Sequence, residues 1–406
     1  MASCVCAEEY ELEYRYAYPP TTEGQRLIPM IKPDEKLSAE PKYGSLKPIY
    51  VTAKFGNEKN NLYTMVFDES KGADSGYDII YIDRNNNEDL TDDPPVQMQG
   101  YGAIRPIGVI NFGPVEILLK YGDKIQPYNF VVQFQMIGKE ELQSGSKVLT
   151  GVFANLNPAR HYLGDIQAGD SSVKIMIEDL NGNGIFNDLY KVQPIETRND
   201  RLYATSDGVS IKYENIDLWQ SNFYAKFIQI DKDWYSMDIS EDGKKISLEK
   251  ADTKFGTIRI PYYVETLRLS SENGIITLHS KGDFVGGTSL EFQVPVGVYQ
   301  LYDYTNLSSL DHNITASGTN SGKKFRVNNG EILDLKIGPP LIINIDSFPP
   351  GNIKAGSIDI FSLTFTGQAG EVVTNLQNIK SNLPKPTFKA VDESGKVVEE
   401  GSFEYG

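Results

Sequence analysis

The chain is dominated by short apolar runs that turn residues interrupt, and this alternation limits the folds that it can adopt. Runs such as PIYVTAKF, LYTMVFD and VKIMIED are each ended by Gly, Asn, Asp or Pro, which is typical of β-strands separated by turns. Apolar residues at helical spacing do not recur over a useful length. Aromatic residues make up 11% of the sequence, and Tyr and Phe favour strands. We therefore predict an all-β protein.

The length and the turn spacing predict several β-sandwich modules. With 406 residues the chain exceeds the usual domain size of about 150 residues. Pro- and Glu-rich residues 8–47 predict an extended arm, and residues 48–250 predict one or more β domains that carry two unusual loops. Turns about every 8 to 12 residues predict a β-sandwich module over residues 251–337. Because the prolines at 339 and 340 cannot continue a strand ladder, we expect a separate C-terminal Ig-like β-sandwich over residues 338–406.

The first residues predict export. Residues 1–7, MASCVCA, place small residues before a charged EEY segment, which is the pattern that signal peptidase cleaves, so we interpret them as the remnant of a signal peptide. An alternative is that Ala2-Ser3-Cys4 ends a lipoprotein lipobox. Cys4 and Cys6 are the two cysteines of the chain, so the remainder folds without disulfides. No later run approaches the about 18 apolar residues of a transmembrane helix. We expect a secreted protein, a cell-envelope protein or a lipoprotein.

The charge balance excludes one class of partner. The formal net charge is −16, from 55 acidic and 39 basic residues, and it repels the phosphate backbone of nucleic acids. The same acidic excess suits the uptake of divalent cations, and it equally suits a surface that only maintains solubility. Charge alone therefore permits a cation site without identifying one.

Two Asx-rich loops carry the clearest motif. The stretches YDIIYIDRNNNEDLTDD (residues 77–93) and VKIMIEDLNGNGIFNDL (residues 173–189) each pass from a predicted strand into a polar loop. We call residues 83–94 the first loop and residues 179–190 the second loop, and we number the positions of each from 1 to 12. The matched residues at positions 1, 3, 5, 8 and 10 are Asp83 and Asp179, Asn85 and Asn181, Asn87 and Asn183, Leu90 and Phe186, and Asp92 and Asp188.

Oxygen-bearing side chains on alternate residues predict Ca²⁺ binding by both loops. Calcium takes about six to eight oxygen ligands, and the EF-hand loop supplies them from positions 1, 3 and 5 and from the carbonyl of position 7. That carbonyl belongs to Asp89 in the first loop and to Ile185 in the second. The bidentate Glu of position 12 is absent, and we expect Asp92 and Asp188 at position 10 to replace it. With so few carboxylates we expect the weak affinity of extracellular modules.

The two loops differ at position 6, where an EF-hand has glycine. Gly184 holds that position in the second loop, whereas the first loop has Glu88, so only the second loop has the residue without a Cβ atom that this sharp turn favours. An alternative for either loop is an ordinary turn, because Asn, Asp and Gly cluster in turns without any metal. The same register in two separate loops favours the calcium interpretation.

Other candidate sites are weaker. The three histidines, His161, His279 and His312, lie far apart in the sequence, and we expect them to be ordinary core or surface residues. No nucleophile elbow, phosphate-binding loop or dinucleotide fingerprint occurs, so no such motif identifies an active site. Four aromatic side chains could stack on sugar rings: Trp219, Tyr224, Trp234 and Tyr235. Because aromatic residues at alternating strand positions belong more often to the core or to an interface, we expect that of these residues instead.

At the two loops and at the C-terminal SGKVVEEGSFEYG, the sequence resembles a loose group of uncharacterised secreted bacterial proteins of the planctomycete type. In that group D-x-N-x-N/D-x-x-L-T-D-D loops precede β-sandwich modules. The resemblance is specific at the loops and general elsewhere. It implies export and calcium binding, and it implies no enzymatic activity.

These observations predict a calcium-stabilised structural or adhesion protein. Its partners would be further copies of itself, in an oligomer or a fibre to which the arm donates a strand, or glycans of a cell surface. A carbohydrate-binding protein is the first alternative. A glycoside hydrolase is a further alternative, because 55 acidic residues can always supply two carboxylates, although no motif isolates such a pair.

Overall fold

The computed structural model describes most of the chain. The described ranges are 7–16, 24–33, 36–56, 61–99, 109–142, 146–190, 206–214, 216–280, 289–309, 314–319, 322–347, 360–378, 387–391 and 394–402. The predicted signal remnant, with Cys4 and Cys6, lies outside these ranges except for its last residue, and so does His312. All statements below concern the described residues.

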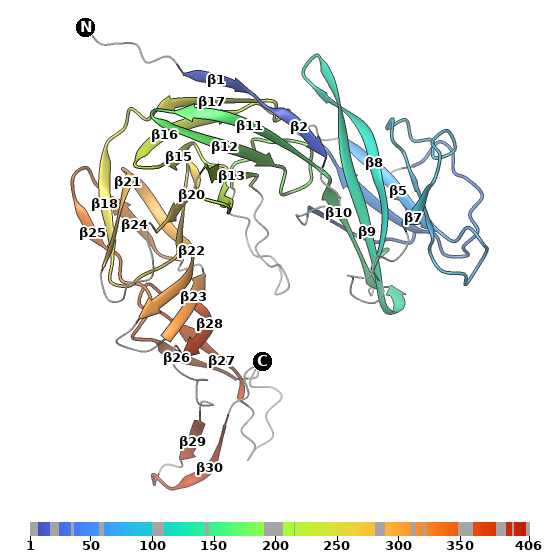
Figure 1. The fold of residues 1–406 in the computed structure, drawn as a ribbon. Helices are drawn as coiled ribbons and strands as arrows, with labels where there is room; N and C mark the ends of the chain where they lie inside the picture. Colours follow the sequence, from blue (N-terminus) through green and yellow to red (C-terminus); the bar gives the residue numbers. More distant parts are fainter. Residues whose placement is uncertain are drawn as a thin grey trace. The chain divides into compact units, whose positions relative to one another are not determined.

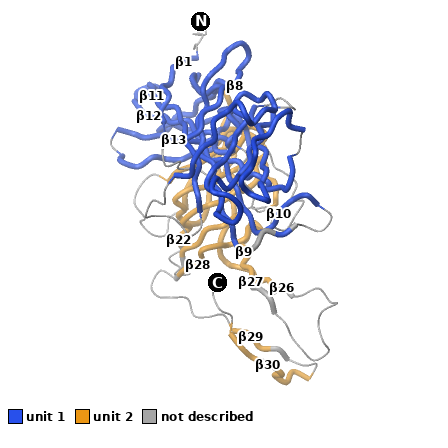
Figure 2. Tube along the Cα trace, turned by 90° about the vertical axis from the view of Figure 1, so that its right-hand side faces the viewer, with its two compact units in different colours: residues 1–250 blue, residues 251–406 orange. Residues whose placement is uncertain are grey.

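Every regular element in these ranges is a β-strand, and nearly all strand pairs are antiparallel, which confirms the predicted all-β class (Figure 1). The described residues therefore offer no helix long and apolar enough to cross a membrane. The chain divides into two compact units, Met1–Lys250 and Ala251–Gly406, which Figure 2 shows in blue and orange. Each unit is described by itself.

Unit 1 contains three antiparallel sheets. The eight-stranded sheet has the order β3 (Gln25–Leu27), β10 (Leu149–Pro158), β9 (Lys124–Leu142), β8 (Val109–Tyr121), β7 (Val96–Gln99), β6 (Ile79–Ile82), β5 (Leu62–Asp68) and β4 (Ile49–Lys54). The five-stranded sheet has the order β14 (Gln220–Phe223), β13 (Gly208–Tyr213), β12 (Ser171–Glu178), β11 (Arg160–Ala168) and β2 (Glu13–Tyr16). The four-stranded sheet has the order β1 (Glu8–Glu11), β17 (Lys245–Lys250), β16 (Asp233–Ile239) and β15 (Phe227–Ile230).

Alternating side chains explain how these sheets form a core. Along β8 the side chains of Val115, Ile117 and Leu119 are buried, whereas those between them face solvent. The inward side chains join one large aromatic and aliphatic cluster that draws on all three sheets. Glu241-Asp242-Gly243 connects β16 to β17 as a hairpin turn, with Gly243 in the left-handed region at φ 73°.

Residues 8–47, expected as an arm, are instead part of unit 1. The strands β1, β2 and β3 each form the edge of a different sheet, where they pair with β17, β11 and β10 of the same chain. The segment lacks a clear apolar period because edge strands this short bury few side chains. The buried ones include Leu27 in β3 and the neighbouring residues Leu12 and Met30. Its strands are already paired, so it is not a free arm.

Unit 2 contains a three-stranded sheet, an eight-stranded sheet and a separate hairpin. The three-stranded sheet has the order β21 (Leu290–Pro295), β18 (Phe255–Ile260) and β25 (Ile332–Asp334), and β25 runs parallel to β18. The larger sheet has the order β20 (Gly274–His279), β19 (Thr266–Ser271), β22 (Gly297–Ser309), β23 (Ile314–Thr319), β28 (Val372–Asn378), β27 (Ile360–Thr366) and β26 (Ile342–Ser347), with β24 (Lys324–Val327) also beside β22. The hairpin is β29 (Thr387–Val391) with β30 (Val397–Ser402).

The expected boundary at Gly338 lies inside unit 2. Strand β28 pairs with β23, so the strands that follow the double proline extend the same sheet instead of starting a new module. The Gly338 N–H donates to buried Glu371 Oε1 at 2.6 Å, and Tyr262 Oη donates to the Pro339 carbonyl at 3.0 Å. The prolines lie between β25 and β26, and these bonds hold the turn against its own unit.

Two candidate cation-binding loops

The two loops occupy equivalent places in two different sheets of unit 1. Strand β6 ends directly before Asp83, and strand β12 ends directly before Asp179. The next strands, β7 and β13, are the antiparallel neighbours of β6 and β12. Each loop therefore begins where the chain leaves one strand, on its way to the adjacent strand.

The position 1 carboxylate organises the backbone of both loops. In the first loop, the N–H groups of Asn87 and Glu88 donate to Asp83 Oδ1 at 3.0 Å and Oδ2 at 2.8 Å. In the second, the N–H groups of positions 5 and 6 donate to Asp179 Oδ1 at 3.3 Å and Oδ2 at 2.7 Å. Each carboxylate draws the chain around itself, as Asx side chains do in turns.

The amides of positions 3 and 5 then meet the carboxylate of position 10. Asn85 Nδ2 and Asn87 Nδ2 donate to Asp92 Oδ2 at 3.2 and 2.8 Å. In the second loop the corresponding distances from Asn181 and Asn183 to Asp188 Oδ2 are 2.9 and 2.6 Å. The oxygens of the same amides accept backbone N–H groups two residues further along at 2.8 to 3.1 Å. We call this repeated set of bonds the loop frame.

The backbone takes the left-handed region at positions 4 and 6 of both loops. Gly182 and Gly184 have φ values of 71° and 82°, and Asn86 and Glu88 have φ values of 56° and 66° at the same positions. The absence of glycine in the first loop therefore does not change the backbone path. Asn86 and Glu88 therefore adopt a left-handed backbone conformation that is strained for any residue with a Cβ atom.

The apolar residue at position 8 fixes each loop to the rest of unit 1. Leu90 and Phe186 are 1% and 0% exposed. The Leu90 N–H donates to the Ala39 carbonyl at 3.1 Å, and the Phe186 N–H donates to the Glu241 carbonyl at 3.0 Å. The bridge between Ala39 and Asp89 is parallel, so the Asp89 carbonyl faces away from Ala39, on the side where the Asp89 N–H meets Asn87.

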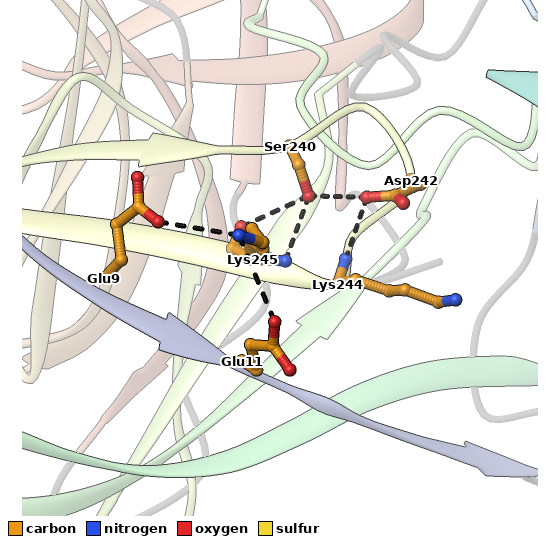
Figure 3. A network of polar contacts seen from close by, with 6 residues as sticks. All are labelled: Glu9, Glu11, Ser240, Asp242, Lys244 and Lys245. Carbon is orange, nitrogen blue, oxygen red and sulfur yellow. Dashed lines mark hydrogen bonds and ion pairs between the residues drawn. The ribbon is translucent and has the colours of Figure 1, made fainter. Parts of the chain in front are cut away.

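The turn that receives Phe186 is itself held to the N-terminal strand (Figure 3). Ser240 Oγ donates to Asp242 Oδ1 at 2.6 Å, and the Lys244 N–H donates to the same oxygen at 3.2 Å. Lys245 Nζ lies 3.5 Å from a carboxylate oxygen of Glu9 in β1. The second loop is thus connected through the β16–β17 turn to the edge strand β1.

Burial separates the two loops. Asp179 is fully buried and also accepts a hydrogen bond from Tyr128 Oη at 2.7 Å. Burial raises its pKa to about 6, against the opposing effect of these hydrogen bonds. Burial also raises the pKa of Asp83, whose loop is otherwise solvent-exposed at Asn85, Asn87 and Asp92. The second loop therefore holds its carboxylate at the larger desolvation cost.

Asp207 is a carboxylate at the second loop that lies outside the predicted motif. Asp207 directly precedes β13 and is 0% exposed, and its Oδ2 accepts the Asp188 N–H at 2.7 Å. Burial first, and then the charge of Asp179, raise the pKa of Asp207 well above its ordinary value. In the sequence Asp207 is a single Asp before a predicted strand, well after the loop motif, and no local pattern connects it to the second loop.

The ten residues predicted to bind metal form two separate groups, one in each loop. No three or more His, Cys, Asp or Glu side chains of the described residues are grouped so as to hold a metal ion by themselves. Amide and carbonyl oxygens would have to contribute, as the prediction assumed. His161 lies in β11 of unit 1 and His279 in β20 of unit 2.

The aromatic residues considered for sugar stacking lie mostly in the core. Tyr224, Trp234 and Tyr235 are buried, and Trp219 is half-buried. A buried ring cannot offer its face to a sugar.

Comparison of the chain with protein-family models, with curated proteins and with solved structures finds no match. The resemblance to secreted bacterial proteins therefore remains a prediction.

Proposed function

We propose that this is a secreted or cell-envelope structural protein that Ca²⁺ stabilises, with a role in adhesion or assembly and no catalytic activity. The observation that carries the proposal is the loop frame, which occurs twice, at the ends of two strands in different sheets. A turn that only reverses the chain has no need of the same four Asp and Asn residues, together with an apolar residue, in the same register. A cation site does need them, and on binding the amides of positions 3 and 5 would turn their oxygens from the backbone N–H groups toward the ion.

Electrostatics supports a role for a cation in stability. Each loop holds two carboxylates, at positions 1 and 10, within one short segment. A divalent cation bound there would offset their repulsion. An ion that binds only the folded protein stabilises it by mass action whenever its free concentration exceeds the dissociation constant. Loops with few carboxylates suit the high calcium concentrations outside cells. Export and a structural role are therefore consistent with each other.

Two details of the predicted function change. The strands of residues 8–47 are paired within unit 1, so we do not include donation of an N-terminal strand to a neighbouring copy. With three of the four candidate aromatic residues buried, glycan binding through them is not part of the proposal.

The test is a calorimetric titration of chelator-treated full-length protein with CaCl₂, together with melting curves in calcium and in chelator. We expect two bound ions of weak affinity and a higher Tm in calcium. MgCl₂ serves as the control, because Mg²⁺ demands a tighter octahedral shell and should bind more weakly. Absence of both calcium heat and a calcium-dependent Tm would refute the proposal.

A further inference from the structure

Asp207 is tied to the second loop by two reciprocal bonds. The Asp188 N–H donates to Asp207 Oδ2 at 2.7 Å, and the Asp207 N–H donates to the Asp188 carbonyl at 3.1 Å. The Asp207 carbonyl accepts the Tyr224 N–H at 2.7 Å, which secures the same segment from its other side. Position 10 of the loop and the start of β13 are thus held together by one side-chain and one backbone hydrogen bond.

The second oxygen of this carboxylate is unsatisfied. Asp207 Oδ1 is buried and has no hydrogen-bond partner. Of all charged groups, Asp179 acts most strongly on Asp207, followed by Asp188. In the described part of the chain, no Lys, Arg or His side chain forms a salt bridge with any of the three. Asp179 and Asp207 are fully buried, and the buried Arg160 lies over the Phe186 ring at 5.8 Å without forming a salt bridge to either. Buried carboxylates without a salt-bridge partner are costly, and a bound cation would offset that cost.

The first loop contains a matching third carboxylate at a different place in the chain. Asp93, at position 11, accepts the Arg84 N–H at 2.7 Å through its Oδ2, and its charge raises the pKa of Asp83. Position 11 of the second loop is Leu189, whose side chain cannot accept a hydrogen bond or carry a charge. Burial raises the pKa of Asp207, and the backbone N–H of Leu180, which corresponds to Arg84, is one of the groups that oppose this rise.

We propose that Asp207 is the third acidic residue of the second calcium site, where it takes the part of the position 12 Glu of an EF-hand. This inference rests on the proposed function. The three carboxylates are not yet grouped as metal ligands in the structure, so binding draws Asp207 Oδ1 toward the ion held by Asp179 and Asp188. The ion then joins the end of β12 to the start of β13, which the sequence separates widely.

The test uses the full-length Asp92→Asn protein, in which the first loop is weakened and the remaining calcium heat reports the second. Calorimetry then compares Asp207→Asn with the matched control Asp165→Asn in this background. Asp165 is an exposed acid of β11 that pairs with Lys174 at 2.7 Å, so the control has the same change of charge. We expect Asp207→Asn to weaken calcium binding about 10- to 100-fold, and the control to change it less than about twofold.

A second readout separates binding from a merely structural role. In chelator, Asp207→Asn should melt no lower than its parent, because Asn retains an acceptor for the Asp188 N–H and removes a buried charge. In calcium it should melt lower than its parent. If Asp207→Asn lacks a folded near-UV spectrum, Asp207→Ser is measured instead.

The outcomes distinguish the two proposals. Unchanged calcium affinity in Asp207→Asn would overturn the role of Asp207 and leave the calcium proposal standing. A wild type that binds one ion, lost in Asp92→Asn, would show that the second loop is no site and would also overturn this inference. A wild type that binds no calcium would refute the proposed function and this inference together.

Discussion

The two loops have the same hydrogen-bond frame in very different surroundings. In the first loop the amides of Asn85 and Asn87 are exposed, whereas the second loop is half-buried or buried throughout. The frame follows from the spacing of Asx residues after a strand, so it forms in either setting. What burial changes is the consequence of losing a partner, because water can replace a missing bond only at the exposed loop. The difference predicts that equivalent substitutions cost more in the second loop.

The largest difference should come from the apolar anchors at position 8. The Phe186 ring lies in the main core of unit 1, 5.2 Å from the Tyr162 ring and 6.5 Å from the Tyr128 ring. Leu90 lies in a cluster of only four buried residues. Phe186→Ala should therefore lower the free energy of unfolding by about 4 kcal/mol, and Leu90→Ala by about 2 kcal/mol, because the smaller site can collapse more fully.

Urea unfolding of the full chain measures both variants. The chain has two tryptophans, Trp219 and Trp234, and both lie in unit 1, so their fluorescence reports that unit in the intact protein. Equal losses for the two variants would show that burial does not distinguish the loops.

The position 1 carboxylates should give the next effect, measured in chelator. Asp179→Ala leaves Tyr128 Oη and the N–H of Gly184 buried without an acceptor, which should lower the free energy of unfolding by about 3 kcal/mol. Asp83→Ala leaves the N–H groups of Asn87 and Glu88 near solvent, and we expect a loss of about 1 kcal/mol. The Asp→Asn variants are the controls, since they retain an acceptor and should lose less. A larger loss for Asp83→Ala would reverse the comparison.

Position 6 should give a smaller effect that again depends on the loop. A Cβ atom on Gly184 would lie 2.3 Å from Leu119 Cδ1, and the residue has a φ of 82°. We expect Gly184→Ala to lower the free energy of unfolding by about 2 kcal/mol through this contact and the strained backbone. Glu88→Ala should change it by less than about 0.5 kcal/mol, because that position already carries a Cβ atom in the same conformation. The same fluorescence-detected unfolding decides, and a neutral Gly184→Ala would contradict the close packing.

The sequence predicted what local patterns encode. Alternating apolar residues gave the strand class, and the Asx spacing located both loops, their anchors and their position 10 partners. It failed where the information is long-range. The edge strands β1 to β3 are three or four residues long, and their partners lie far away in the chain, so no local period marks them. The pairing of β28 with β23 across the double proline was missed for the same reason.

Asp207 shows the same limit within the candidate site. Position 11 of the first loop supplies its third carboxylate in sequence, next to Asp92, and a motif can include it. The second loop obtains the equivalent group from the residue before β13, because the pairing of β12 with β13 returns the chain to the loop. Only the register of that strand pair brings Asp207 to Asp188.

The smallest expected effect is a gain. Glu88 has a φ of 66°, which costs a residue with a side chain about 1 kcal/mol relative to glycine, although glycine is more flexible when unfolded. Glu88→Gly should therefore raise the free energy of unfolding by about 0.5 kcal/mol. The Ser38 N–H bond to the Glu88 carbonyl, at 2.8 Å, involves only the backbone and should be preserved. If strain at position 6 limits the first loop, calcium affinity should rise together with stability. A stability gain without a change in calcium affinity would mean that the frame was already complete, and that burial alone makes the two loops differ.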